Sequence, residues 1–147
     1  MDEQTSKVLI VDDDRTNLKI LTKIVESQGY ETENASGGNE ALSLLETLTP
    51  DLILLDIMMP DINGIEVCKK LQQDPRLSDI PVIMVTGDTD VETLKKSFDA
   101  GATDFVSKYV NRVEFAARIR AAFRLRNEIR RRRECESKLK ELQDSQK

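Results

Sequence analysis

The sequence predicts an α/β fold in which helices cover both faces of a parallel sheet. Short apolar runs without polar alternation recur along the chain, which is typical of strands that are buried on both sides. Helical patterns separate these runs, and turn residues precede them. A chain of 147 residues that is 39% hydrophobic can build one such domain and an appended segment.

The strands are expected at four apolar runs and one polar run. The apolar runs lie at residues 8–11, 52–55, 82–85 and, more weakly, 105–106. Residues 30–33, with the sequence Tyr-Glu-Thr-Glu, are more polar and therefore suit an edge strand.

Four helices are expected between the strands, each after residues that favour a turn or a helix cap. These residues are Asp14, Asn17, Gly37, Gly38, Asn63, Gly64, Asp88, Thr89 and Asp90. Strand and helix alternate about five times, which implies right-handed crossovers between parallel strands. The sequence therefore predicts a flavodoxin-like (βα)₅ sandwich, in which ligands bind beyond the carboxyl ends of the strands.

A long C-terminal helix is expected from Val113 to about Leu142. No Pro or Gly interrupts this segment, and Ala, Arg, Glu, Lys and Leu dominate it. Its first half should pack on the sheet, whereas four arginines at 130–133 interrupt the second half. The apolar stripe of that half consists of Leu125, Ile129, Leu139 and Leu142. A solvated helix and a two-stranded coiled coil both remain open.

Composition excludes several kinds of chemistry. The chain has no histidine, the commonest general base and transition-metal ligand. Its two cysteines lie far apart and predict reduced thiols in a cytoplasmic protein, and no apolar run has the length of a membrane helix. Residues 111–147 carry 12 Lys and Arg against 6 Asp and Glu, although the whole chain has a net charge of −5. The acidic body and the basic tail are therefore expected to have different functions.

The expected strand ends carry a set of polar side chains. Asp12 and Asp13 follow the first strand and Asp56 follows the third, so a parallel sheet would bring three carboxylates together. Such carboxylates repel one another unless a cation compensates them, and Mg²⁺ suits a site of this kind because it prefers oxygen ligands. Lys108 and Thr86, at two other strand ends, add a positive charge and a hydroxyl donor. The sequence therefore predicts a site for Mg²⁺ and phosphate.

These residues and their neighbours resemble the receiver family of two-component response regulators. The pieces that carry the resemblance are residues 8–14, 54–60, 63–66, 81–87 and 100–108. All five occur in order and at suitable spacing, which makes the resemblance specific. It covers roughly residues 6–123 as a receiver domain and leaves 124–147 as a helical extension or coiled-coil linker. The resemblance also implies the strand order 2-1-3-4-5.

The resemblance implies a role for each strand-end residue. Asp56 is the implied phosphoacceptor, and Thr86 and Lys108 are the implied switch hydroxyl and counter-charge. The implied metal site consists of Asp12, Asp13, Asp56 and the backbone carbonyl of Met58. Phe105 is the implied switch aromatic. The protein would catalyse its own phosphorylation and slow dephosphorylation without being a conventional enzyme.

The resemblance also implies partners. A sensor histidine kinase or a phosphotransfer protein would donate the phosphoryl group, because the chain has no histidine of its own. The signal would leave through the face made by the fourth helix, fifth strand and fifth helix, and through the C-terminal helix. A homodimer through that helix and an output domain after it are expected partners. Direct contact with nucleic acid or a membrane is not expected, because the body is acidic.

Two positions depart from the family pattern. The family usually has Lys-Pro with a cis bond, but Tyr109 follows Lys108 here, and a cis bond before a residue other than proline costs about 3–4 kcal/mol. A trans Lys108–Tyr109 bond is therefore favoured. Asn63 stands where Asp is common, and either residue can support the turn before Gly64.

Two other functions compete with a phosphorylation switch. Residues 12–16 also satisfy the Asp-x-Asp-x-Thr pattern of haloacid-dehalogenase-type phosphatases, with Asp12 as nucleophile and Asp14 as general acid and base. In that function Asp56 would have no role, and the chain has no segment for a cap domain. The second alternative is an interaction module that is not phosphorylated, which the complete set of acids disfavours.

Overall fold

A five-stranded parallel sheet organises the chain, as seen in a computed structural model that describes residues 6–87, 90–108 and 111–145. The strands are β1 (Lys7–Val11), β2 (Glu31–Ala35), β3 (Leu52–Asp56), β4 (Val82–Thr86) and β5 (Asp104–Ser107). The helices are α1 (Arg15–Ser27), α2 (Gly38–Leu44), α3 (Gly64–Gln72), α4 (Val91–Asp99) and α5 (Arg112–Ser145). The strand order is β2-β1-β3-β4-β5, so the predicted (βα)₅ fold with order 2-1-3-4-5 is confirmed.

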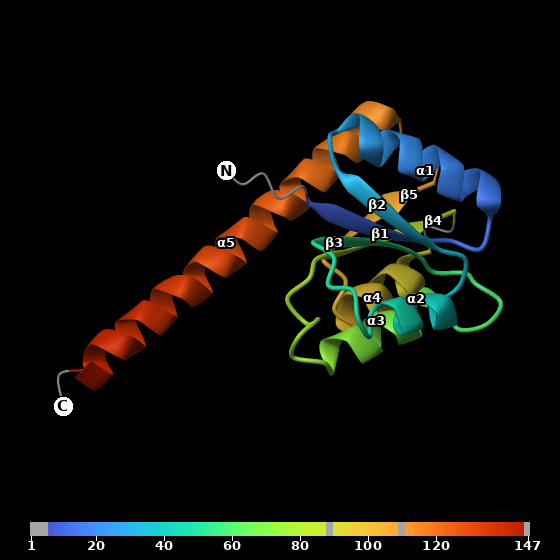
Figure 1. Cartoon of the computed structure of the whole chain (residues 1–147). Helices are drawn as coiled ribbons and strands as arrows, with labels where there is room; N and C mark the ends of the chain where they lie inside the picture. Colours follow the sequence, from blue (N-terminus) through green and yellow to red (C-terminus); the bar gives the residue numbers. More distant parts are fainter. Residues whose placement is uncertain (1–5, 88–89, 109–110, 146–147) are drawn as a thin grey trace.

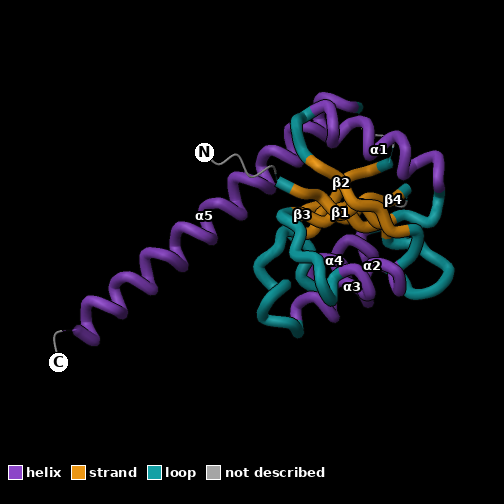
Figure 2. Tube along the Cα trace, in the orientation of Figure 1, coloured by secondary structure: helices purple, strands orange, loops and turns teal. Residues whose placement is uncertain are grey.

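Helices cover both faces of the sheet (Figures 1 and 2). Alternate residues of each inner strand enter two separate cores: Leu9 and Leu55 face α2, α3 and α4, whereas Ile10 and Leu54 face α1 and α5. This explains why the inner strands are continuously apolar in sequence. The polar strand β2 lies at an edge of the sheet, as expected.

Asp14 and Asn63 cap helices as expected, whereas Asn17 lies inside α1 rather than before it. The Asp14 carboxylate accepts a hydrogen bond of 2.9 Å from the Thr16 backbone N–H and caps α1. The Asn63 side chain does the same for the Glu66 N–H at the start of α3, at 2.9 Å. Asparagine therefore serves at this position as a cap.

Helix α5 is continuous from Arg112 to Ser145, and its first half packs on the sheet as predicted. Phe115, Ile119 and Phe123 are buried against α1 and the strands. The ring of Phe123 stacks on Tyr30 with centroids 4.3 Å apart. These apolar contacts fix the direction in which the rest of the helix leaves the body (Figure 1).

Ionic contacts hold the next turns of α5 to the body. Arg126 is only 8% exposed, and its guanidinium lies 2.7 Å from the Asp51 carboxylate just before β3. Arg130 reaches the same carboxylate at 3.4 Å, and Arg133 pairs with Asp79 at 2.7 Å. The helix therefore stays attached to the body for more than two turns beyond Phe123.

The side of α5 that faces the body also includes Ile129. This residue is half-buried and lines a small pocket with Arg76 and Ile80 of the body. The expectation that Ile129 belongs to the same stripe as Leu125, Leu139 and Leu142 is therefore wrong. Those three leucines are exposed. Residue 129 is turned by about 40° around the helix axis from residue 125, and in this helix the turn brings Ile129 toward the body.

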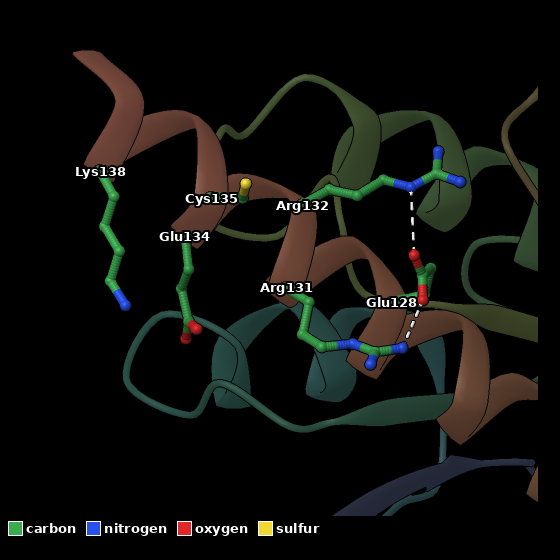
Figure 3. A pocket seen from close by; sticks show the side chains of 6 residues that line it. All are labelled: Glu128, Arg131, Arg132, Glu134, Cys135 and Lys138. Atoms are coloured by element: carbon green, nitrogen blue, oxygen red, sulfur yellow. Dashed lines mark hydrogen bonds and ion pairs between the residues drawn. The ribbon is translucent and has the colours of Figure 1, made fainter. Parts of the chain in front are cut away.

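Further along α5, Glu128 pairs with Arg131 and Arg132 on the same helix (Figure 3). Two of the four successive arginines thus share one carboxylate of the same helix, and the other two contact carboxylates of the body. Among the residues that the structure describes, no helix is long and apolar enough to cross a membrane.

Candidate functional site

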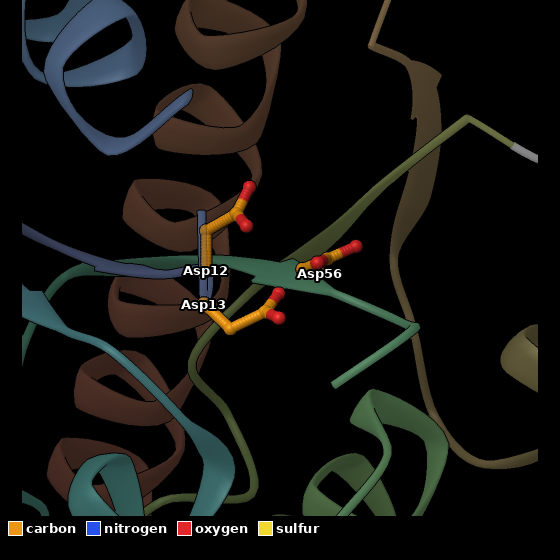
Figure 4. Close-up of side chains that lie close together, drawn as sticks. All are labelled: Asp12, Asp13 and Asp56. Atoms are coloured by element: carbon orange, nitrogen blue, oxygen red, sulfur yellow. The ribbon is translucent and has the colours of Figure 1, made fainter. Parts of the chain in front are cut away.

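Three carboxylates meet at the carboxyl ends of β1 and β3 (Figure 4). The two strands are parallel neighbours with Val11 opposite Leu55, so the residues that follow Val11 lie beside Asp56. One oxygen each of Asp12, Asp13 and Asp56 can be chosen so that all lie within 4.8 Å of one another. The sequence prediction that these three acids share one site agrees with this geometry.

The three acids differ in burial and in their partners. Asp12 is 0% exposed and Asp56 1% exposed, whereas Asp13 is exposed. Asp12 Oδ1 accepts a hydrogen bond from the Asp14 N–H at 2.9 Å. Within the described residues, Asp12 Oδ2 and both oxygens of Asp56 have no hydrogen-bond partner. Buried carboxylate oxygens without donors are costly, and a bound cation would offset that cost.

Lys108, which follows β5, provides a positive charge for this site. Its Nζ lies 3.6 Å from Asp56 Oδ2 and 3.9 Å from Asp12 Oδ2. The Lys108 backbone N–H donates to the Thr86 carbonyl at 2.9 Å, which holds the end of β5 against β4. One ammonium faces two buried carboxylates and the exposed Asp13, so the cluster keeps an excess of negative charge.

The electrostatics of the cluster change the pKa of Asp56. Burial, then the neighbouring Asp12, raise the pKa of Asp56 to about 7, whereas Lys108 and, less strongly, the nearby Met58 backbone N–H lower it, although that N–H does not reach hydrogen-bond geometry. A divalent cation beside Asp56 would favour its ionised form and lower that pKa. Binding of a cation should therefore stabilise this buried cluster more than it would stabilise an exposed cluster of acids.

The donor set fits Mg²⁺. The cluster offers three carboxylates and, at these positions, no nitrogen or sulfur ligand. Mg²⁺ prefers such oxygen ligands and keeps waters that phosphate oxygens can replace. Asp12, Asp13 and Asp56 are thus the residues that could hold it.

The loop that follows β3 packs closely around Asp56. The Gly64 N–H donates to the Ile57 carbonyl at 2.8 Å, and a Cβ on Gly64 would overlap the Asp56 carbonyl. Glycine is therefore required here so that α3 can begin directly beside the acid. Asp61 accepts hydrogen bonds from the backbone N–H groups of Gly38 and Asn39, and so joins this loop to α2. The sequence analysis missed Asp61, because nothing distinguishes it there from other loop acids.

The other predicted site residues lie around the same edge. Thr86 is buried at the end of β4. The side chain of Met58 is 67% exposed, and Phe105 is half-buried against the core on the α2, α3 and α4 side. Asp88 and Tyr109 lie outside the described residues. The predicted trans bond between Lys108 and Tyr109 therefore also lies outside them. The roles predicted for Met58, Thr86 and Phe105 remain predictions.

The fold and the acidic site at its strand ends define a class of signalling domain, and comparison with known proteins agrees. The chain belongs to the response regulator receiver domain family, whose sequence model matches residues 8–120. Members of this family act as phosphorylation switches in two-component systems and generally bind Mg²⁺ at an acidic pocket.

Relatives and solved structures support this assignment. The DNA-binding response regulator MtrA of Mycolicibacterium smegmatis is 39% identical over 128 residues, which cover 87% of this chain and 54% of that protein. The probable transcriptional regulator ycf27 of Guillardia theta is 42% identical, with 85% and 48% covered. A CheY-like receiver domain protein of Methanospirillum hungatei has a TM-score of 0.80 at 32% identity, with 85% and 98% covered.

The comparisons also bear on the alternatives. The chain spans about half the length of the two named relatives. Family membership disfavours the phosphatase alternative, and Asp14, its proposed acid and base, caps α1 instead. The expectation of no direct contact with nucleic acid gains no support, because relatives are named as DNA-binding proteins.

Proposed function

We propose that this receiver is a Mg²⁺-dependent switch that accepts a phosphoryl group on Asp56. The observation that carries the proposal is the buried Asp56 carboxylate. Both of its oxygens lack hydrogen-bond donors within the described residues, and it lies beside two further acids and 3.6 Å from Lys108 Nζ. A nucleophilic carboxylate needs free oxygens, and its phosphorylated form needs nearby positive charge.

The chemistry would be a transfer from a phosphohistidine outside these 147 residues, because they contain no histidine. An Asp56 oxygen attacks phosphorus, the bond from phosphorus to the donor nitrogen breaks, and the electron pair stays with the imidazole. Mg²⁺ held by Asp12, Asp13, Asp56 and the Met58 carbonyl would supply positive charge for the phosphoryl oxygens. Lys108 neutralises a further oxygen of the acyl phosphate.

The proposed readout begins at Thr86. Its hydroxyl moves toward the phosphoryl group, and Phe105 turns inward into the space this opens. The movement changes the face formed by α4, β5 and α5. The half-buried state of Phe105 supports this step, because the ring has room to become more buried.

We propose that residues 6–123 act as the receiver and residues 124–147 as a linker to an output domain. The support is that the relatives are about twice as long and are named as DNA-binding or transcriptional regulators. The contacts of Arg126, Arg130 and Arg133 with the body make the first turns of this linker part of the receiver surface. Self-association through the distal part of α5 belongs to the same proposal.

The test is transfer of labelled phosphate from a histidine kinase or from acetyl phosphate to the full chain. Asp56→Asn should abolish labelling, and Asp13→Asn or Mg²⁺ removal should strongly reduce it. Asp14→Asn is the matched control: it removes a neighbouring acid but keeps a residue that can cap α1, so labelling should persist. Mg²⁺-independent labelling of the Asp56→Asn chain would disprove the proposal.

The readout has its own test. Analytical ultracentrifugation should show a larger average mass when a beryllofluoride mimic of the phosphoryl group is added to the full chain. A version that ends at Arg124 should not respond, because it lacks the distal part of α5. If neither version changes its association state when the mimic is added, the solvated-helix alternative is favoured.

A further inference from the structure

The distal part of α5 has two different sides. One side faces the body and consists of Arg126, Ile129, Arg130 and Arg133, which we call the docked side. The other side points away from the body, and Figure 3 shows Arg132 and Cys135 there beside the Glu128 ion pairs. The contacts with the body therefore do not occupy this second side.

The second side has the spacing of a coiled-coil core. Its residues follow steps of three and four, which correspond to positions a and d of a heptad repeat. They are Leu125, Glu128, Arg132, Cys135, Leu139 and Leu142, which we call the exposed seam. Leu125, Leu139 and Leu142 are 41%, 56% and 60% exposed, and Cys135 is also exposed. Three leucines and a cysteine at core positions are a surface that a second helix would bury.

We propose that the exposed seam binds a second copy of this chain in a short, parallel, in-register coiled coil, with the two Cys135 thiols facing each other. This inference specifies the self-association proposed above, naming its surface and orientation. It does not depend on phosphoryl transfer at Asp56. It also replaces the stripe expected from sequence, because the exposed seam includes Cys135 and leaves out Ile129.

The charges beside the seam favour the parallel orientation. Arg124, Arg131 and Lys138 occupy the g positions, and Glu136 and Gln143 occupy the last two e positions. In a parallel pair, g of one helix lies near e of the next heptad of its partner, which places Arg131 opposite Glu136. An antiparallel pair instead brings g positions together, so three basic residues of each helix would face basic residues.

The two charged core positions make the pair weak but tolerable. Arg132 already contacts Glu128 of its own helix at 3.3 Å, so its charge is partly compensated before association. The seam is also short: 18 residues of α-helix span about 27 Å. Charged core layers lower stability and favour one register. A weak dimer is therefore expected, and covalent trapping is the suitable way to detect it.

The first experiment oxidises the full chain with diamide, which takes up the two thiol hydrogens as a disulfide forms. Cys68 is buried, so Cys135 is the exposed thiol. A covalent dimer should form and should disappear in Cys135→Ser. Absence of a dimer from the unaltered chain would overturn the proposal.

Orientation is tested by moving the thiol within the Cys135→Ser chain. Leu142→Cys, on the seam, should restore the covalent dimer, whereas Ser137→Cys, on the far side of the helix, should not. An antiparallel pair centred on residue 135 would separate the two residues 142 by about 21 Å along the axis. Trapping at 135 without trapping at 142 would overturn the parallel orientation. Equal trapping at 137 and 142 would show random collision and overturn the seam.

A matched pair of charge reversals tests the flanking contact. Glu136→Lys should place the new lysine of each helix opposite Arg131 of the other helix. The repulsion should slow trapping about ten-fold. Glu134→Lys makes the same change of charge two residues away, on the outer surface of the predicted pair, and should leave the rate within about two-fold. Equal effects would contradict the assigned register. The Asp56→Asn chain should be trapped like the unaltered one, which separates this inference from the proposed phosphorylation.

Discussion

At the carboxyl edge of the sheet, the buried Asp12 and Asp56 share the ammonium of Lys108, whereas at the opposite edge Asp51 meets Arg126 at 2.7 Å. Asp51 also accepts a hydrogen bond of 2.8 Å from the Lys7 N–H, but both Asp56 oxygens lack such donors within the described residues. Both edges contain buried charged groups. Only at the edge of Asp51 does each buried charged group have an opposite charge in close contact. Incomplete compensation is what one expects of a ligand site, and complete compensation of a structural joint.

The largest effect is expected from breaking the contact between Asp51 and Arg126. Asp51→Ala should leave the Arg126 guanidinium buried without its partner and destabilise the chain by about 2–4 kcal/mol. Asp79→Ala removes a partner of the exposed Arg133 and should cost less than about 1 kcal/mol. Urea unfolding of both variants measures the difference. Equal destabilisation would show that Arg126 does not depend on Asp51.

Removing an acid at the other edge should have the opposite sign. Burial and Asp12 raise the pKa of Asp56 from 3.8 to about 7, so the folded chain binds this proton more tightly than the unfolded chain. The resulting stability is complete below the unfolded pKa and is lost as pH rises toward about 7. Without Mg²⁺ at pH 8, Asp56→Asn should therefore stabilise the chain by on the order of 1–3 kcal/mol. Urea unfolding should show this gain shrinking toward pH 5, and a variant less stable than the parent at pH 8 would contradict it.

Metal should reduce the difference between the two edges. Mg²⁺ at about ten times its dissociation constant should stabilise the parent chain by about 1.4 kcal/mol, because it binds only the folded state. The gain should be smaller in Asp56→Asn, which lacks one carboxylate, and EDTA should reverse it. Thermal unfolding with and without Mg²⁺ gives the measurement. Equal gains in the two chains would place the ion elsewhere.

The smallest effect concerns the lifetime of the phosphorylated state. Met58 is two residues after Asp56, and its thioether cannot orient an attacking water well. Met58→Asn offers an amide at the same place and should shorten the lifetime several-fold. Decay of labelled acyl phosphate is the measurement. An unchanged lifetime would show that another step limits hydrolysis.

The sequence predicts the acidic cluster at Asp56 better than the contact between Asp51 and Arg126, for a physical reason. Continuous apolar runs identify buried parallel strands, and the acids after 8–11 and 52–55 must then meet at one edge. Asp51 and Arg126 are 75 positions apart, and neither differs in sequence from an ordinary surface charge. The sequence places Ile129 in the exposed stripe because residues four apart lie close together around a helix. Nothing in the sequence shows that the body covers the flank of α5 on which Ile129 lies.

The attachment of α5 has a mechanical consequence. Apolar contacts up to Phe123 and ion pairs up to Arg133 fix the root of the helix, and the remaining 12 residues to Ser145 extend about 18 Å beyond it. A stiff rod held at one end acts as a lever. A tilt of about 10° at the root would move the tip by about 3 Å, more than half a helical turn. In the proposed switch, a small rearrangement at the root of α5 would therefore become a displacement of several ångströms at Ser145.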